Sequence, residues 1–176
     1  NDLVRGVDVI VHSGSVDSDA SVSEQLDYQT RCTYNLLWAA WEERVPRVVY
    51  LSSLGVMDKY DKGYYVTEQW RPLPVAEPPA LTFHLSEMVC KEFAREHKLQ
   101  AVCLRLGDLI WDQGHSHESA LFPDDAVQAV EKALTVEIEN WAVFNIHSGV
   151  TNNRFSTAKA EKLLGFTPSS AVGGSR

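Results

Sequence analysis

The chain has 176 residues, of which 44% are apolar and 23% are charged, and its formal net charge is −8. This composition is ordinary for a globular domain and excludes a disordered chain. The acidic balance lacks the basic footprint of a nucleic-acid binder, and a membrane span needs about 20 apolar residues, far more than the apolar run at 36–41. We therefore expect neither a nucleic-acid partner nor a membrane contact.

Strands and helices alternate in the sequence. Four runs rich in β-branched and aromatic residues predict buried strands over 7–12, 47–52, 101–106 and 142–146. Apolar residues at steps of three and four predict helices over 21–44, 84–97, 124–134 and 156–164. Ser21 or Ser23 is the expected N-cap of the first helix. The alternation predicts an α/β fold of three layers around a parallel sheet.

The start of the chain and its two longest loops suggest how it is organised. It begins at Asn1 rather than Met, so we expect it to be a piece of a longer protein. One domain is predicted over residues 1–168, followed by a flexible tail over 169–176. Two long loops, 55–79 and 111–123, follow the C-terminal ends of predicted strands. Ligands bind at that edge of open α/β sheets, so these loops are the expected walls of a site.

The cysteines and histidines give no metal motif. Cys32, Cys90 and Cys103 lack the two-residue spacing of zinc or redox sites, which favours reduced thiols in a cytoplasmic protein. His115 and His117 form the one histidine cluster, without the helical spacing of metalloprotease ligands. No metal site is therefore expected, and His12 at a strand end is interpreted as a packed, hydrogen-bonded side chain.

The order in which several short motifs follow one another along the chain is more specific for a protein family than any one of them. The strand ends read Asp-Val-Ile-Val-His-Ser-Gly at 8–14, Arg-Val-Val-Tyr-Leu-Ser-Ser at 47–53 and Val-Cys-Leu-Arg-Leu-Gly at 102–107. With the helical segments 29–40, 93–99 and 154–166, the chain resembles the extended short-chain dehydrogenase/reductase family. This family is also called the NAD-dependent epimerase/dehydratase family, and the nearest type is uronate dehydrogenase.

The resemblance spans about residues 3–168 and implies the C-terminal part of a Rossmann-like, NAD(P)-binding domain. The family's Gly-rich phosphate turn is absent, because no Gly-x-Gly-x-x-Gly or Gly-x-x-Gly-x-x-Gly follows a predicted strand. If the resemblance holds, the segment that carries this turn is missing from the chain. The resemblance still implies NAD or NADP as the cofactor of the intact family member.

The resemblance also implies site residues. Ser53 matches the family's catalytic serine, although a hydrogen bond to its own turn is an equally weighted interpretation. Gln29 falls at the active-site asparagine and Asp108 at a substrate position, where capping of a turn is the competing interpretation. The expected cofactor contacts are Ser13, Gly14, Ser15, Leu51, Ser52 and Gly107. Small residues predict one shared cleft for Ser13, Gly14, Ser52 and Ser53.

The family's Tyr-x-x-x-Lys pattern does not match. An ungapped alignment puts Pro79 at the tyrosine and Phe83 at the lysine, and a four-residue slip puts Phe83 and Glu87 there. None of these side chains is a phenol or an ammonium, so the acid/base pair is missing. The preceding loop offers three phenols without a correctly spaced lysine, Tyr60, Tyr64 and Tyr65.

Three functional hypotheses follow. The first is a weakly active or inactive member of the family that acts on or binds a sugar or nucleotide-sugar. The second is a non-catalytic, nucleotide-binding regulatory module. The third is a protein-interaction module with an unpaired sheet edge. The expected partners are a small-molecule sugar or nucleotide and, as an assembly, a second copy in a homodimer.

Overall fold

The structure is a computed structural model that describes residues 2–14, 19–97, 99–111, 117–150 and 153–169. Its main strands are β1 (Val9–His12), β2 (Arg47–Ser53), β3 (Gln100–Leu106) and β6 (Trp141–Ile146). The helices are α1 (Val22–Glu42), α2 (Ala80–His97) and α3 (Pro123–Thr135), with short turns η1 (Leu54–Met57) and η3 (Ala160–Leu164). A small pair, β4 (Asp108–Leu109) and β5 (Ala120–Leu121), completes the order.

The four main strands form one parallel sheet in the order β1-β2-β3-β6. Val9 pairs with Arg47, Tyr50 with Cys103, and Leu104 with Phe144. All four predicted strands are therefore confirmed, and those over 7–12, 47–52 and 101–106 are adjacent and parallel as predicted.

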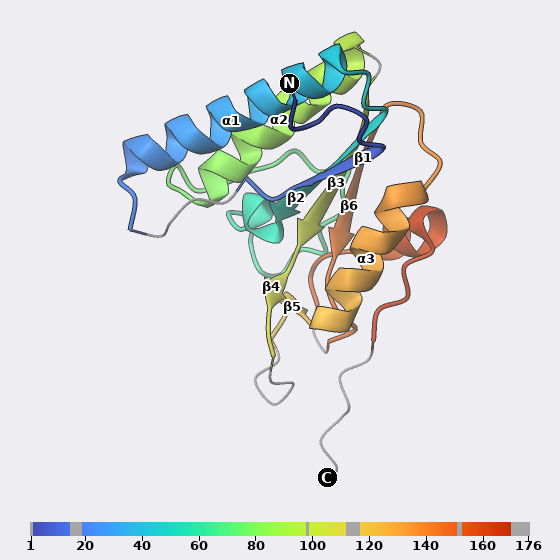
Figure 1. Cartoon of the computed structure of the whole chain (residues 1–176). Helices are drawn as coiled ribbons and strands as arrows, with labels where there is room; N and C mark the ends of the chain where they lie inside the picture. The colour runs from blue at the N-terminus through green and yellow to red at the C-terminus, as the bar shows by residue number, and fades with distance from the viewer. Residues whose placement is uncertain (1, 15–18, 98, 112–116, 151–152, 170–176) are drawn as a thin grey trace.

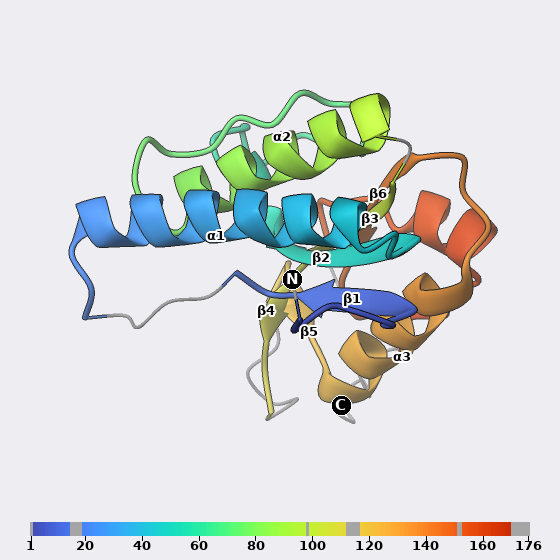
Figure 2. The same cartoon turned by 45° about the horizontal axis from the view of Figure 1, so that its top comes forward.

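Helices cover both faces of the sheet, with α1 and α2 on one side and α3 and η3 on the other (Figures 1 and 2). Alternation along each strand supplies two separate cores. Tyr50 and Cys103 pack with Leu37, Phe93 and other residues of the α1/α2 layer. Their strand neighbours pack on the opposite layer in a cluster that includes Val49, Val102, Leu104, Phe144, Ala129 and Leu164. The predicted three-layer α/β fold is confirmed.

The start of α1 is fixed by a capping box. Ser21 Oγ accepts a hydrogen bond from the Glu24 backbone N–H at 3.3 Å, and the Glu24 carboxylate accepts one from the Ser21 N–H at 2.8 Å. The helix buries the stripe Gln29, Thr33, Leu37 and Ala40. Ser21 rather than Ser23 is therefore the N-cap.

Three elements differ from the prediction. Helix α2 begins at Ala80, four residues before position 84, because Pro79 precedes it and the first turn of a helix tolerates proline. The β4–β5 pair inside the second loop was not predicted, since two residues are too few for a periodic pattern. The last helical segment is a single π-type turn over Ala160–Leu164, ended as expected by Gly165 in the left-handed region at φ 68°.

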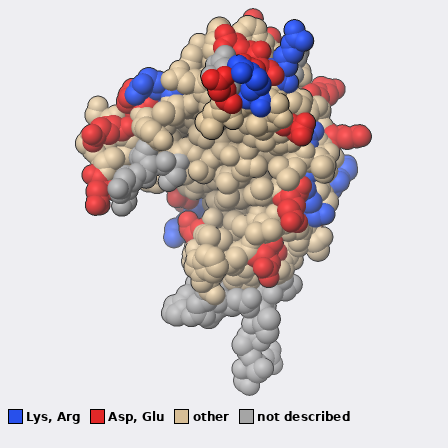
Figure 3. All heavy atoms as spheres, in the orientation of Figure 1, with Lys and Arg blue, Asp and Glu red and all other residues tan. Residues whose placement is uncertain are grey.

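The surface carries mixed charge. On the face in Figure 3, acidic and basic side chains alternate around the rim and the centre is uncharged. All three cysteines are free thiols, and Cys90 and Cys103 are buried. Within the part of the chain that the structure describes, no helix is long and apolar enough to cross a membrane, and no group of three candidate metal ligands occurs. His115 lies outside the described residues.

Candidate functional site

The parallel sheet brings the C-terminal ends of β1 and β2 to one edge, so Gly14 and Ser53 lie at the same end of the sheet. Gly14 has φ +60°, and a Cβ there would meet Gln29 Cγ and His12 Nε2 at 3.4 Å each. The end of β1 thus lies against α1, and two predicted site residues, Gly14 and Gln29, are neighbours in space. Ser13 beside them is exposed, whereas Ser15 lies outside the described residues.

His12 is a packed histidine, as predicted. Its Nε2 lies 2.8 Å from Thr33 Oγ1, and burial lowers the pKa of the imidazole. The Thr33 hydroxyl donates to the Gln29 carbonyl at 2.7 Å, so His12 Nε2 is the donor to Thr33. The neutral ring therefore links β1 to α1. The neighbouring residues, rather than His12, are left to contact a ligand at the sheet edge.

Ser52 does not take the expected place in the cleft. Its side chain is buried and donates to Glu87 Oε1 at 2.6 Å, under helix α2. Along a strand successive side chains point to opposite faces, so Ser52 faces α2 while its neighbours do not. Ser52 therefore does not face a cleft at the strand ends, and a cleft shared by Ser13, Gly14 and Ser53 stays a prediction.

Ser53 caps the turn that follows β2. Its Oγ accepts a hydrogen bond from the Gly55 backbone N–H at 3.0 Å and so begins η1. The oxygen of Ser53 therefore acts as the acceptor in its own turn, as one of the two interpretations expects. The hydroxyl is half-buried at the edge and retains its proton as a donor to a ligand.

Leu51 and Gly107, two expected cofactor contacts, line one apolar cavity of about 390 Å³. Leu106 and the α3 residues Val127 and Val130 complete its walls. A side chain at Gly107 would force the backbone of Ser119 to move, because a Cβ would lie 2.1 Å from the Ser119 carbonyl oxygen. The cavity offers a flat apolar surface next to the strand ends.

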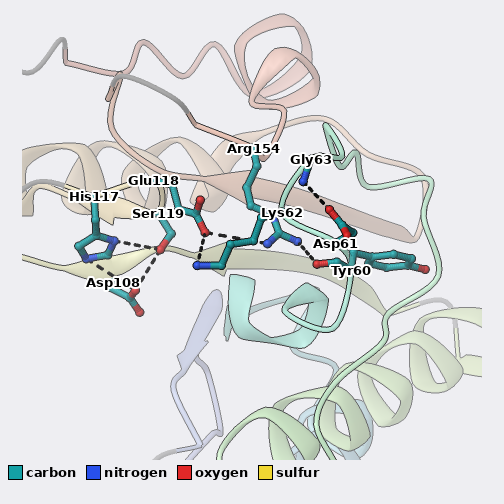
Figure 4. A network of polar contacts seen from close by, with 9 residues as sticks. All are labelled: Tyr60, Asp61, Lys62, Gly63, Asp108, His117, Glu118, Ser119 and Arg154. Atoms are coloured by element: carbon teal, nitrogen blue, oxygen red, sulfur yellow. Dashed lines mark hydrogen bonds and ion pairs between the residues drawn. The ribbon is translucent and has the colours of Figure 1, made fainter.

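Asp108 lies in a polar network beyond β3 (Figure 4). Its Oδ2 accepts a hydrogen bond from Ser119 Oγ at 3.0 Å and lies 3.8 Å from His117 Nε2. Both Asp108 and His117 are largely exposed. The network can therefore present a carboxylate and an imidazole to a polar ligand.

Four more charged side chains gather beside that network. Glu118 Oε1 lies 4.0 Å from Lys62 Nζ and 3.9 Å from Arg154 Nη1, and Arg154 Nη2 donates to the Tyr60 carbonyl at 2.8 Å (Figure 4). Burial raises the pKa of the nearby Asp58 carboxyl. Sequence reasoning missed all four, because they come from separate loops that only the fold brings together.

The residues that the ungapped alignment matches to the family's tyrosine and lysine, Pro79 and Phe83, carry no proton-transfer group. Pro79 precedes the first turn of α2, and Phe83 packs against the apolar cluster of Leu54, Val56, Met57, Val66 and Phe155. Tyr60 donates its hydroxyl to the Arg71 carbonyl at 2.7 Å, and its ring lies edge-on to Trp70. Phe83 therefore takes part in hydrophobic packing.

Glu87, the alternative match to the family's lysine, is hydrogen-bonded to other side chains of the protein. Its carboxylate receives two hydrogen bonds from the Arg105 guanidinium, at 3.0 and 2.7 Å, besides the one from Ser52. Both members of the pair are buried. Glu87 is therefore a structural anion that joins α2 to β2 and β3.

Comparison with known proteins gives the family. Residues 1–142 match the model of the NAD dependent epimerase/dehydratase family. No curated protein matches the chain in sequence. The fold is similar to that of glucuronic acid dehydrogenase from Chromohalobacter salexigens, with a TM-score of 0.87 at 21% identity, over 97% of this chain and 65% of that one.

Two further structures share the fold. Uronate dehydrogenase from Agrobacterium tumefaciens has a TM-score of 0.81 at 19% identity, over 95% of this chain and 63% of that one. UDP-glucuronic acid 4-epimerase from Bacillus cereus, solved in complex with NAD, has a TM-score of 0.75 at 17% identity, over 95% and 71%. The chain spans less than two thirds of the two dehydrogenases. By its sequence match and its fold, the chain belongs to the NAD-dependent epimerase/dehydratase family.

Proposed function

We propose that this chain binds a nicotinamide dinucleotide and a sugar or nucleotide-sugar at the C-terminal edge of its sheet, with little or no turnover. The observation that carries the proposal is that neither alignment with the family's Tyr-Lys pair supplies a proton-transfer pair: Phe83 packs against an apolar cluster, Pro79 has no ionisable group, and Glu87 is paired with Arg105. A family fold without its acid/base group supports binding rather than catalysis.

The residues at the edge fit one end of the cofactor. The apolar cavity beside Leu51 and Gly107 suits a flat ring. The sequence contains no Gly-rich turn to hold a pyrophosphate, so the affinity of this chain is expected to be low. When bound, a nicotinamide supplies hydride exchange. The choice between NAD and NADP has no determinant among these residues.

Oxidation of a bound sugar would fail at its proton-transfer step. Oxidation of a sugar hydroxyl requires a base for its proton, and a positioned acid or base contributes about 10²–10⁴-fold. The Ser53 hydroxyl is too weakly basic for that role, and it already caps the η1 turn. Asp108, with Ser119 and His117, would instead hold the polar part of the ligand.

Titration calorimetry with NAD(H) and NADP(H), followed by a nicotinamide reduction assay on uronic acids and nucleotide-sugars, tests the proposal. We expect weak binding without turnover. Turnover that is lost in Ser53→Ala would overturn the non-catalytic part. Failure of both cofactors to bind would overturn the binding part.

One observation favours an interaction module as a second candidate. Strand β1 is the outer strand of the four-stranded sheet and pairs only with β2 in the described part of the chain. Val11 on this strand is 45% exposed. An open strand edge can accept another strand by backbone pairing. Concentration-dependent association, weakened by Val11→Pro, would support this function, and a monomer at all concentrations would oppose it.

A further inference from the structure

A second cavity, of about 330 Å³, lies on the α2 face of the sheet. It is bounded by the segment 68–72, by helix α2 and by strands β3 and β6. It shares no lining residue with the apolar cavity beside α3, which lies on the opposite face. Neither the dinucleotide proposal nor the family match assigns a role to it.

The apolar part of this cavity's lining includes two tryptophans. Trp70, Pro72, Met88 and Trp141 line it. The Trp70 ring is held edge-on by Tyr60, with ring centroids 4.8 Å apart. Aromatic walls favour a flat ligand, because stacked and edge-on rings attract each other beyond their burial of apolar area.

Its floor is polar and rigid. Arg105 and Glu87 line the cavity and are buried, with 3% and 4% of their surfaces exposed. Arg105 uses Nε and Nη2 for Glu87, while the one contact of Nη1 among the described residues is with Met57 Sδ at 3.5 Å, a weak acceptor. The guanidinium has five N–H donors and therefore retains capacity for an oxygen ligand.

Two more polar groups at this face lack partners among the described residues. His84 lines the cavity, and its Nδ1 is buried without a hydrogen bond. Asn145 pairs with Arg105 across the β3–β6 ladder, and neither atom of its buried side-chain amide has a hydrogen bond. Buried polar atoms are nearly always hydrogen-bonded, so these groups indicate a region suited to a polar ligand.

The charge of the lining favours an anion. The lining holds three cations, Arg71, Lys91 and Arg105, against two carboxylates: Glu87, which pairs with Arg105, and Glu68, whose Oε1 also accepts a hydrogen bond from the Asn145 backbone N–H at 2.9 Å. Arg71 and Lys91 are exposed at the cavity. From the aromatic walls, the donor at Arg105 and these cations, we propose that this cavity binds a small aromatic carboxylate.

The test uses two pairs of probes that differ only in charge. Benzoate and indole-3-acetate are titrated against the chain, with benzamide and indole-3-acetamide as neutral counterparts. Calorimetry measures the affinity of all four probes, and for the non-indole pair tryptophan fluorescence reports contact with Trp70 and Trp141. We expect saturable binding of the acids and binding of the amides that is weaker by about tenfold, the effect of one lost charge-assisted contact. Equal affinity for acids and amides, or no saturable binding, would overturn the proposal.

Two variants locate the binding. Met88→Trp fills the cavity from a side chain that is 51% exposed, and Lys91→Glu reverses a charge at its rim. Each is expected to weaken benzoate binding by about tenfold. The matched control is Lys59→Glu, an exposed lysine outside the cavity lining, which should leave the affinity unchanged. Unchanged affinity in both folded cavity variants would place the ligand elsewhere and contradict the assignment.

Discussion

Single residues hold the layers of this protein together, and the buried Glu87–Arg105 pair does so most directly. It joins helix α2 to strand β3 through a 2.7 Å ion pair, and Ser52 on β2 donates to the same carboxylate. Removing one member of a buried pair leaves an uncompensated charge in the interior. The pair therefore matters more to stability than the exposed ion pairs on the same helix.

Glu87→Gln is expected to destabilise the fold by about 3 kcal/mol, because Arg105 loses its counter-charge while remaining buried. Urea denaturation monitored by circular dichroism measures the change. The matched control is Glu92→Gln on the same helix, whose pair with Arg95 is exposed and screened by solvent, so its loss should cost much less. Equal losses in the two variants would contradict this assignment.

Gly107 shows a second kind of residue effect. A Cβ at this position would lie 2.1 Å from the Ser119 backbone oxygen, so Gly107→Ala must displace β5. We expect a loss of about 1–3 kcal/mol, typical of overpacking. Gly63→Ala is the control, since its nearest neighbour is the side chain of Asp61 at 3.3 Å, which can move. Thermal unfolding of both variants gives the comparison.

Stability should also depend on pH through His12. Burial lowers the pKa of its imidazole in the folded state, so the unfolded chain binds the extra proton more readily. The free energy of unfolding is thus expected to fall as the pH drops below about 6.5, the ordinary pKa of histidine. His12→Gln should flatten this dependence between about pH 7.5 and 5.5. An identical slope in the variant would show that His12 does not contribute.

At the scale of elements, the sequence was informative wherever a pattern was long. The strands and α1 were predictable because buried parallel strands and an amphipathic stripe repeat over several residues. The β4–β5 pair left no such pattern, because each of its strands has only two residues. The early start of α2 left none either, because it depends on Pro79. Element ends therefore follow from caps and tertiary contacts more than from periodicity.

The cap of α1 gives a direct test at this scale. Ser21→Ala removes the acceptor of the Glu24 N–H and should destabilise the protein by about 0.5–2 kcal/mol. Ser23→Ala, two residues along the same exposed turn, is the matched control and should have a smaller effect. Urea denaturation distinguishes the two, and a larger loss in Ser23→Ala would show that the cap is assigned wrongly.

At the scale of the whole molecule, only part of the candidate site could be predicted. The family resemblance drew attention to Gly14 and Gln29, which the fold makes neighbours in space. Lys62, Glu118 and Arg154 escaped notice, because loops distant in sequence gather them at the edge and no local pattern marks them. The same limit applies to the cavity under segment 68–72, whose walls come from four separate parts of the chain.

The central claim is that the family fold is retained here while the acid/base step is lost. The initial rate of nicotinamide reduction, measured with saturating cofactor and a uronic acid, tests it most directly. The account predicts the same background rate for the chain and for Ser53→Ala, because neither proposed alignment with the family's Tyr-x-x-x-Lys pattern, Pro79 with Phe83 or Phe83 with Glu87, supplies a phenol and an ammonium. A rate well above background that disappears in Ser53→Ala would contradict it.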